Sequence, residues 1–129
     1  MKFPKNLDSE FVVMTPDKQA VIERCDAEIY TRLDQNYDNF AGHELISSYE
    51  FQSDWSSWEM HPQGDEVVVL LTGTVTFLFE GSDGQTAVHL TEQGQYLVVP
   101  KGTWHTAKTQ VKSKLLFITP GEGTQHKPV

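Results

Sequence analysis

Cysteine is almost absent from this chain, whose 129 residues include only Cys25. One thiol cannot build an internal disulfide framework, so the chain is suited to a reducing compartment. Long hydrophobic runs are missing as well, and none approaches the roughly 18 apolar residues that a membrane-spanning helix requires. The first ten residues lack the apolar segment of a secretory signal. We therefore expect a cytoplasmic protein without a membrane partner.

Basic residues are outnumbered, with 10 lysines and arginines against 18 aspartates and glutamates and a formal net charge of -8. Such a chain repels nucleic acid unless its basic residues cluster, and no cluster is visible. No glycine-rich phosphate loop follows a predicted strand, and no G-x-S-x-G motif is present. These absences exclude a nucleic-acid partner and give no support to nucleotide chemistry or serine hydrolysis.

The first third of the chain contains the one predicted helix. Residues 10–14 and 19–25 are expected to form short strands on either side of a Thr-Pro-Asp turn. A helix is predicted over residues 26–38, with Asp26 as its cap. Its apolar side chains recur every three or four positions, at Ile29, Leu33, Tyr37 and Phe40.

From residue 43 onward the sequence consists of short segments in which apolar and polar residues alternate. These segments are rich in β-branched residues and are separated by turns. About eight such strands predict an all-β sandwich or small barrel. We expect a single domain. Within it, residues 1–42 supply strands and a helix that pack on the barrel, residues 43–120 form the barrel, and residues 121–129 form a surface tail.

The segment EVVVLL is apolar at every position from 67 to 71. A strand with one face in solvent alternates between apolar and polar residues. This strand does not alternate, so both of its faces should be covered. The barrel core can cover one face, and the helix or a second subunit the other, which favours a homodimer. Trp58 and Met60 are predicted to form an exposed patch that suggests a subunit contact.

Two glutamates and a histidine lie close together just before this strand. Glu59 and His61 are two positions apart and therefore share one face of a strand, while Glu66 follows a turn and starts the next strand. His105 begins a later strand after a Pro-Gly turn. Imidazole nitrogens and carboxylates that converge in this way bind divalent metals at about 2.0–2.2 Å. The four residues are thus candidate metal ligands.

The spacing of these residues resembles the first motif of the cupin superfamily, G-x5-H-x-H-x(3,4)-E-x6-G. In this chain the motif positions are occupied by Ser53, Glu59, His61, Glu66 and Gly73. Ser53 replaces the first glycine, which is a common relaxation.

A second segment resembles the second cupin motif, G-x5-P-x-G-x2-H-x3-N. Its positions are Gly94, Pro100, Gly102, His105 and Thr109, where threonine replaces the asparagine. The resemblance implies a jelly-roll β-barrel with a short N-terminal helical and extended segment. It also implies a small pocket inside the barrel, with a metal at its base.

One departure from the family pattern concerns chemistry. Glu59 stands where the family has its first metal-binding histidine. A carboxylate can replace an imidazole, and the resulting set of two glutamates and two histidines favours Mn²⁺ or Fe²⁺, with Zn²⁺ and Ni²⁺ still open. In the alternative reading the metal is lost, and Glu59 binds a histidine in a dry polar cluster or points to solvent.

Function is open between two classes at this stage. The first is a divalent-metal-dependent enzyme, of dioxygenase or isomerase type, that acts on a small polar molecule, with Glu59 or Glu66 as a proton acceptor. The second is a non-catalytic module that binds or senses a small ligand, with or without metal. In either class the partner is a small molecule. Trp55 and Ser57 share the strand parity of Glu59 and are expected to line its pocket, with core packing as the alternative for Trp55.

Overall fold

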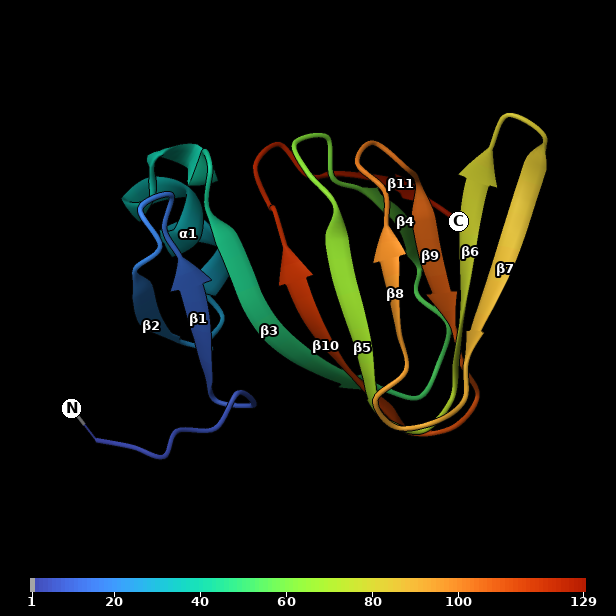
Figure 1. Cartoon of the computed structure of the whole chain (residues 1–129), viewed down its shortest axis with the longest axis horizontal. Coiled ribbons are helices and arrows are strands. Elements are labelled where there is room, and N and C mark those ends of the chain that lie inside the picture. Colours follow the sequence, from blue (N-terminus) through green and yellow to red (C-terminus); the bar gives the residue numbers. More distant parts are fainter. Residues whose placement is uncertain (1) are drawn as a thin grey trace.

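The computed structural model describes residues 2–129, which fold into two antiparallel β-sheets (Figure 1). One sheet has the strand order β2-β1-β3-β10-β5-β8 and consists of β1 (Glu10–Met14), β2 (Ala20–Arg24), β3 (Glu44–Phe51), β5 (Glu66–Thr72), β8 (Tyr96–Val99) and β10 (Ser113–Thr119). The other has the order β11-β4-β9-β6-β7 and consists of β4 (Ser57–Met60), β6 (Val75–Gly81), β7 (Gly84–Leu90), β9 (His105–Lys108) and β11 (Gln125–Pro128). The prediction of an all-β jelly roll with one short N-terminal helix is confirmed.

The main core lies between the two sheets. Strand β5 shows how it forms, because its side chains alternate between buried and half-buried along the strand. Val68 and Leu70 are fully buried and point toward the opposite sheet. There they meet side chains of β6 and β9 such as Phe77 and Ala107.

The helical segment is shorter than predicted. Helix α1 (Ile29–Asn36) begins three residues after Asp26, whose carboxylate accepts a hydrogen bond from the Glu28 amide (2.9 Å) instead of capping the helix at residue 26. After α1, a 3-10 turn η1 (Asp38–Phe40) has positive φ angles that an α-helix does not tolerate. No helix within residues 2–129 is long and apolar enough to cross a membrane.

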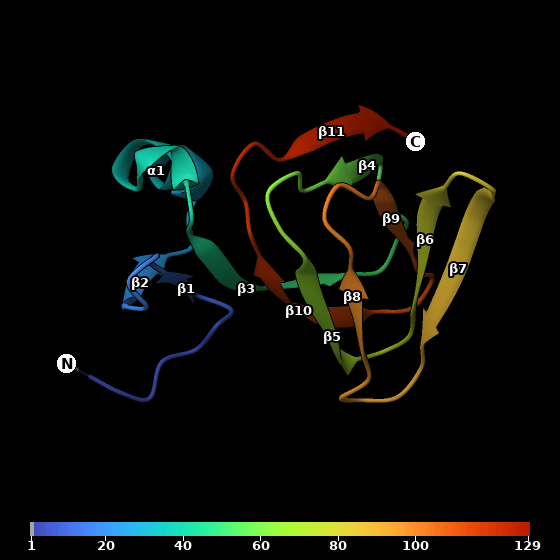
Figure 2. The same cartoon turned by 45° about the horizontal axis from the view of Figure 1, so that its top comes forward.

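Helix α1 and the β1–β2 hairpin form a second, smaller core. The predicted stripe is correct in part, because Ile29, Leu33 and Phe40 are buried and Tyr37 is half-buried. They pack on Phe11, Val13 and Leu45, which lie on the same face of the six-stranded sheet as the main core. Figure 2 shows α1 on the same side of that sheet as β4 and β11. The helix therefore leaves the opposite face of β5 uncovered.

The predicted exposed patch at Trp58 and Met60 is wrong. Trp58 is only 7% exposed and Met60 is half-buried, because the C-terminal residues form β11 and pair with β4. The Lys127 ammonium of β11 lies 4.4 Å from the ring centroid of Trp104 and 5.9 Å from that of Trp58. Nothing in the composition of the tail predicted this strand, and it bears directly on the site described below.

The two sequence motifs end at the same corner of the barrel. The Thr109 hydroxyl donates to the Thr74 carbonyl (2.6 Å), and the Ser113 hydroxyl donates to the same carbonyl (3.1 Å). Gly73 precedes this corner with φ +84°, and a Cβ on it would lie 2.7 Å from the Lys112 carbonyl oxygen and overlap Ser113 Oγ. Glycine is therefore required at Gly73 both by the backbone conformation and by the close approach of β10.

We expect Gly73→Ala to lower the free energy of unfolding by at least about 2 kcal/mol, because strain at positive φ adds to a steric overlap. Gly94→Ala is the matched control, since Gly94 also has a positive φ (+90°) but has no atom within 4 Å of the added Cβ. Urea denaturation measures both variants. Equal losses in the two would show that the close approach at Gly73 is unimportant.

Candidate metal centre

Four of the predicted site residues meet between the sheets. Glu59 on β4 and His105 on β9 are direct cross-strand partners, and His61 follows β4 with the same parity as Glu59. Glu66 reaches the same place from the opposite sheet, where it is the first residue of β5. Strand alternation thus aims all four side chains into the space between the two sheets.

Three of these side chains are almost completely buried. His61, Glu66 and His105 are 4%, 2% and 0% exposed, whereas the Glu59 side chain is 28% exposed. His105 Nε2 lies 3.3 Å from Glu66 Oε1, and His61 Nε2 lies 3.4 Å from Glu66 Oε2. Glu59 Oε2 lies 3.9 Å from His105 Nε2. The buried part of the site therefore consists of two imidazoles on either side of one carboxyl group.

The hydrogen bonds behind the imidazoles determine which nitrogen carries the proton. His105 Nδ1 lies 3.1 Å from the Thr103 carbonyl, which can only accept, so Nδ1 is the donor. His61 Nδ1 lies 2.8 Å from Thr124 Oγ1, whose own hydrogen is donated to the Gly121 carbonyl. His61 Nδ1 is therefore also a donor. In the neutral tautomer each imidazole turns the lone pair of Nε2 toward Glu66.

Glu66 is held in place as an anion. Thr119 donates a hydrogen bond to its Oε2 atom (2.6 Å). Burial raises the pKa of Glu66, but the hydrogen bonds and positive charge of the two neighbouring imidazoles in their protonated form outweigh burial and bring it to about 2. For His105 burial acts in the opposite direction and lowers the pKa. The hydrogen bond and negative charge of the Glu66 carboxylate more than compensate, so the net shift of the His105 pKa is upward. The site thus attracts positive charge to the space beside Nε2 of His105.

Glu59 links the buried site to the C-terminal strand. Its Oε1 atom lies 3.0 Å from His126 Nε2 on β11, while its Oε2 atom faces His105. His126 is the direct cross-strand partner of Glu59 in the β4–β11 pair. Together with Thr124, which holds His61, it makes the tail part of the site.

The donor set fits a divalent metal ion. Within residues 2–129, the buried side-chain atoms without a hydrogen-bond partner include His61 Nε2, Glu66 Oε1 and His105 Nε2. One ligand atom each from Glu59, His61 and His105 also lie within 4.8 Å of one another. Donors around an ion at about 2.1 Å are about 3–4 Å apart, which matches the separations between these side chains. Two carboxylates would balance the charge of the ion.

The two predicted pocket-lining residues occupy different surroundings. Trp55 packs against the main core, with its ring centroid 6.4 Å from that of His105. Ser57 is half-buried, and its carbonyl oxygen accepts a hydrogen bond from Thr106 (2.9 Å). Three residues that touch the site were not anticipated: Thr119, Thr124 and His126. No motif spacing identifies them, because they approach the site through β10 and the tail.

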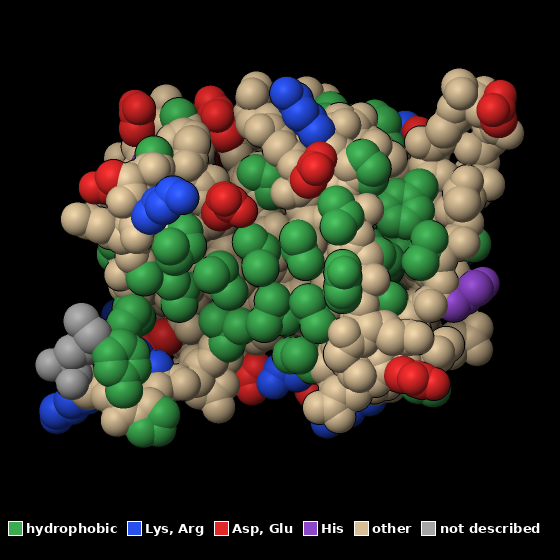
Figure 3. Space-filling view, viewed as in Figure 1, with side chains coloured by type: hydrophobic (Ala, Val, Ile, Leu, Met, Phe, Trp, Pro, Cys, Tyr) green, Lys and Arg blue, Asp and Glu red, His purple; other side chains and the backbone are tan. Residues whose placement is uncertain are grey.

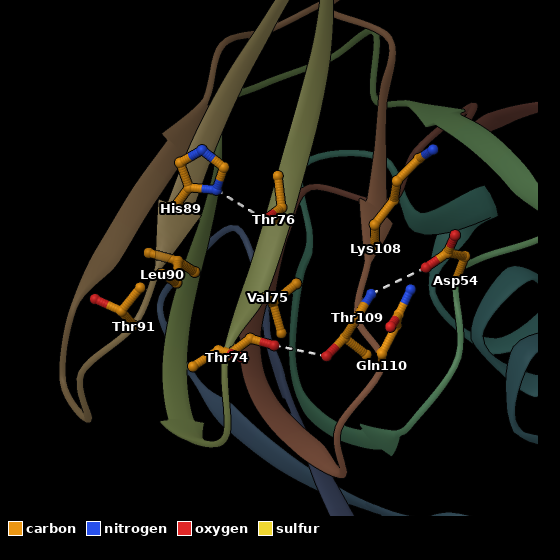
Figure 4. A pocket seen from close by; sticks show the side chains of 10 residues that line it. All are labelled: Asp54, Thr74, Val75, Thr76, His89, Leu90, Thr91, Lys108, Thr109 and Gln110. Atoms are coloured by element: carbon orange, nitrogen blue, oxygen red, sulfur yellow. Dashed lines mark hydrogen bonds between the residues drawn. The ribbon is translucent and has the colours of Figure 1, made fainter.

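A surface hollow of about 540 Å³ lies away from this centre, where β6 begins and β9 ends (Figure 4). Several of its polar groups are already engaged, since His89 Nδ1 pairs with Thr76 Oγ1 (2.8 Å) and Asp54 accepts from the Thr109 amide (3.1 Å). It is broad and open and contains no buried unpartnered group. The hollow therefore lacks the convergent unpartnered groups that distinguish the buried centre.

Comparison with known proteins agrees with this assignment. The model of the EutQ-like cupin domain family matches residues 42–114, a range that contains all four converging side chains. No curated protein sequence matches the chain.

Several solved structures share the fold. A cupin-2 domain containing protein from Shewanella frigidimarina is 23% identical, with a TM-score of 0.51 over 60% of this chain and 70% of that one. A cupin superfamily protein from Desulfitobacterium hafniense is 25% identical, with a TM-score of 0.50 over 59% of this chain and 65% of that one. Hydroquinone 1,2-dioxygenase from Sphingomonas sp. TTNP3 is 15% identical, with a TM-score of 0.50 over 59% of this chain and 58% of that one.

We expect Thr124→Val to weaken the binding of added Zn²⁺ by about 10- to 100-fold, because valine keeps the shape but cannot accept the proton of His61 Nδ1. Competition titration against a chromophoric chelator measures the affinity. Thr76→Val is the control, since Thr76 pairs only with the exposed His89. An unchanged affinity in Thr124→Val would contradict an orienting role for the tail.

Proposed function

This chain belongs to the family of EutQ-like cupin domains, and we propose that it is an enzyme that holds a divalent metal ion and acts on a small polar molecule. The observation that carries the proposal is the convergence of two imidazole lone pairs and a free carboxylate oxygen in a buried space. These atoms repel one another unless a metal ion or a proton lies between them.

The proposed ligands are His61, His105, Glu66 and Glu59. Two carboxylates make this a hard donor set, which favours Mn²⁺ or Fe²⁺ over softer ions. Such an ion supplies Lewis acidity toward a substrate oxygen and, in the case of iron, reactivity with O₂. A dioxygenase or an isomerase is therefore the proposed reaction class, and an oxygenase on this scaffold is consistent with the fold shared with hydroquinone 1,2-dioxygenase.

The two glutamates have different roles in this proposal. Glu66 Oε2 accepts a hydrogen bond from Thr119, Oε1 has no hydrogen-bond partner, and the side chain is 2% exposed, so Glu66 serves only as a ligand. Glu59 is more accessible and binds His126, which is 55% exposed. Glu59 is therefore the more loosely held ligand of the two, and it accepts a proton from a bound substrate when it leaves the ion, with His126 connecting it with solvent.

Metal analysis tests the proposal. We expect untagged protein purified without chelators, or reloaded under anaerobic conditions, to contain about one ion per chain, as one four-ligand site implies. The double variant His61→Ala/His105→Ala should lose it. His89→Ala is the control, because His89 is an exposed histidine outside the site. A wild-type protein that takes up none of Mn²⁺, Fe²⁺, Zn²⁺ or Ni²⁺ would contradict the proposal.

Coordination separates an enzyme from a non-catalytic binding module. Water-proton relaxation of the Mn²⁺-loaded protein counts exchangeable waters on the ion, and an enzyme should keep one or two positions open. A closed coordination sphere would support the binding module. Oxygen uptake by the iron-loaded protein then separates the oxygenase from the isomerase.

A further inference from the structure

Trp55 presents a second unpartnered polar group inside the barrel. Its indole Nε1 atom is buried and has no hydrogen-bond partner within residues 2–129. Because a buried donor without an acceptor destabilises a fold, a phenylalanine would suit a purely structural role better. An indole nitrogen can only donate, so its missing partner is an acceptor.

The ring of Trp55 lies among other aromatic rings. Its centroid is 5.8 Å from that of Phe77, 6.0 Å from that of Phe51 and 6.1 Å from that of Phe117. The remaining neighbour is His105, at 6.4 Å, whose Nε2 atom is itself unpartnered. The Trp55 amide donates to the Ala107 carbonyl (3.0 Å), which fixes the residue beside β9. Among the buried side-chain atoms without a partner in residues 2–129, Trp55 Nε1 is thus the donor, and it belongs to an aromatic wall beside His105.

The charge of the metal centre restricts the class of ligand that it can bind. Glu59 and Glu66 neutralise a divalent ion, and the buried residues between 2 and 129 include no lysine or arginine. A dianion would therefore enter a neutral site that has no cation to compensate it. A carbonyl or hydroxyl oxygen on a flat or apolar body suits both the donor and the aromatic wall.

We propose that Trp55 is a ligand-binding residue, whose Nε1–H donates to an oxygen of an uncharged, flat hydroxy-carbonyl compound held at the metal centre. This inference rests on the proposed function, because the second oxygen of the ligand needs the ion. It adds the substrate class and the residue that recognises it.

The test uses the Co²⁺-loaded protein, whose visible absorption reports changes at the ion. The probes are maltol, a neutral hydroxypyranone, and oxalate, a dianion without an apolar body. Trp55→Phe keeps an aromatic ring and removes the donor. Trp104→Phe is the matched control, because Trp104 is half-buried beneath Lys127 on β11.

We expect Trp55→Phe to bind Co²⁺ like the wild type but to bind maltol about tenfold more weakly, the loss of one hydrogen bond. Trp104→Phe should leave both affinities unchanged, and the wild type should prefer maltol to oxalate. The metal-free Trp55→Phe protein should melt no lower than the wild type, since its buried donor is gone.

Equal maltol affinity in Trp55→Phe and the wild type, with normal Co²⁺ binding, would overturn this inference alone. A preference for oxalate would overturn the ligand class. Failure of the wild type to bind Co²⁺ would overturn the proposed function and this inference with it.

A different observation concerns the outer face of the six-stranded sheet. One row of cross-strand partners crosses all six strands and consists entirely of β-branched apolar residues: Ile22, Val12, Ile46, Ile118, Val67 and Val98. Leu116, Val69 and Tyr96 form a second row beside it. Figure 3 shows these apolar side chains as a continuous patch with charged groups at its margins.

We infer that a second copy of this chain covers this outer face. The helix cannot cover it, because α1 packs on the other face of the sheet. Six strands about 4.8 Å apart and about 20 Å long give a flat sheet area on the order of 600 Å² per chain. Because protruding side chains add to the accessible surface of a flat sheet, the buried area approaches that of a stable dimer. A flat β-branched face suits a twofold pair of sheets. The charges of a chain at -8 then stay outside the contact.

Sedimentation velocity at micromolar concentration tests this contact. The wild type should sediment as a dimer, and Ile118→Lys, at the middle of the row, should sediment as a monomer with unchanged circular dichroism. Val111→Lys is the control, because Val111 is 49% exposed and lies in the loop before β10. A monomeric wild type, or a dimeric Ile118→Lys protein, would overturn the inference.

Discussion

Two imidazole nitrogens and one carboxylate oxygen meet in a buried space between the sheets. Each presents a lone pair, and none receives a hydrogen bond. The rest of the structure serves to hold this unfavourable arrangement. The Thr103 carbonyl and the Thr124 hydroxyl fix the tautomers of the histidines, and Thr119 fixes the carboxylate. Without a cation, a proton on His105 is the substitute, which agrees with the raised pKa of that residue.

The site depends on contacts from both sheets and from the tail. Glu66 comes from β5 in one sheet, while Glu59 and His105 are partners on β4 and β9 in the other. Strand β11 pairs with the edge of β4, which places His126 beside Glu59. The replacement of a histidine by Glu59 is therefore accompanied by a histidine on the neighbouring strand, so that the carboxylate has a partner at the mouth of the site.

The two faces of the six-stranded sheet have different surroundings. Its inner face carries the core, the Glu66 ligand and the seat of α1. A row of apolar residues crosses its outer face from edge to edge, with the charged residues Glu50 and Lys114 on the same face. Strand β5 belongs to both, because its alternate residues point either into the barrel or out of it. A fully apolar strand is thus consistent with one core face and one contact face.

The sequence by itself determined most of the barrel strands and the set of converging side chains, because strand parity and motif spacing are local properties. They placed Glu59 and His61 on one face and brought Glu66 back to the same place after a turn. Only the tertiary structure decided what surrounds these residues. The strand at Gln125–Pro128, the burial of Trp58 and the roles of Thr119, Thr124 and His126 depend on pairings between segments far apart in the chain. No local pattern encodes such pairings, since any polar tail residue could have remained in solvent.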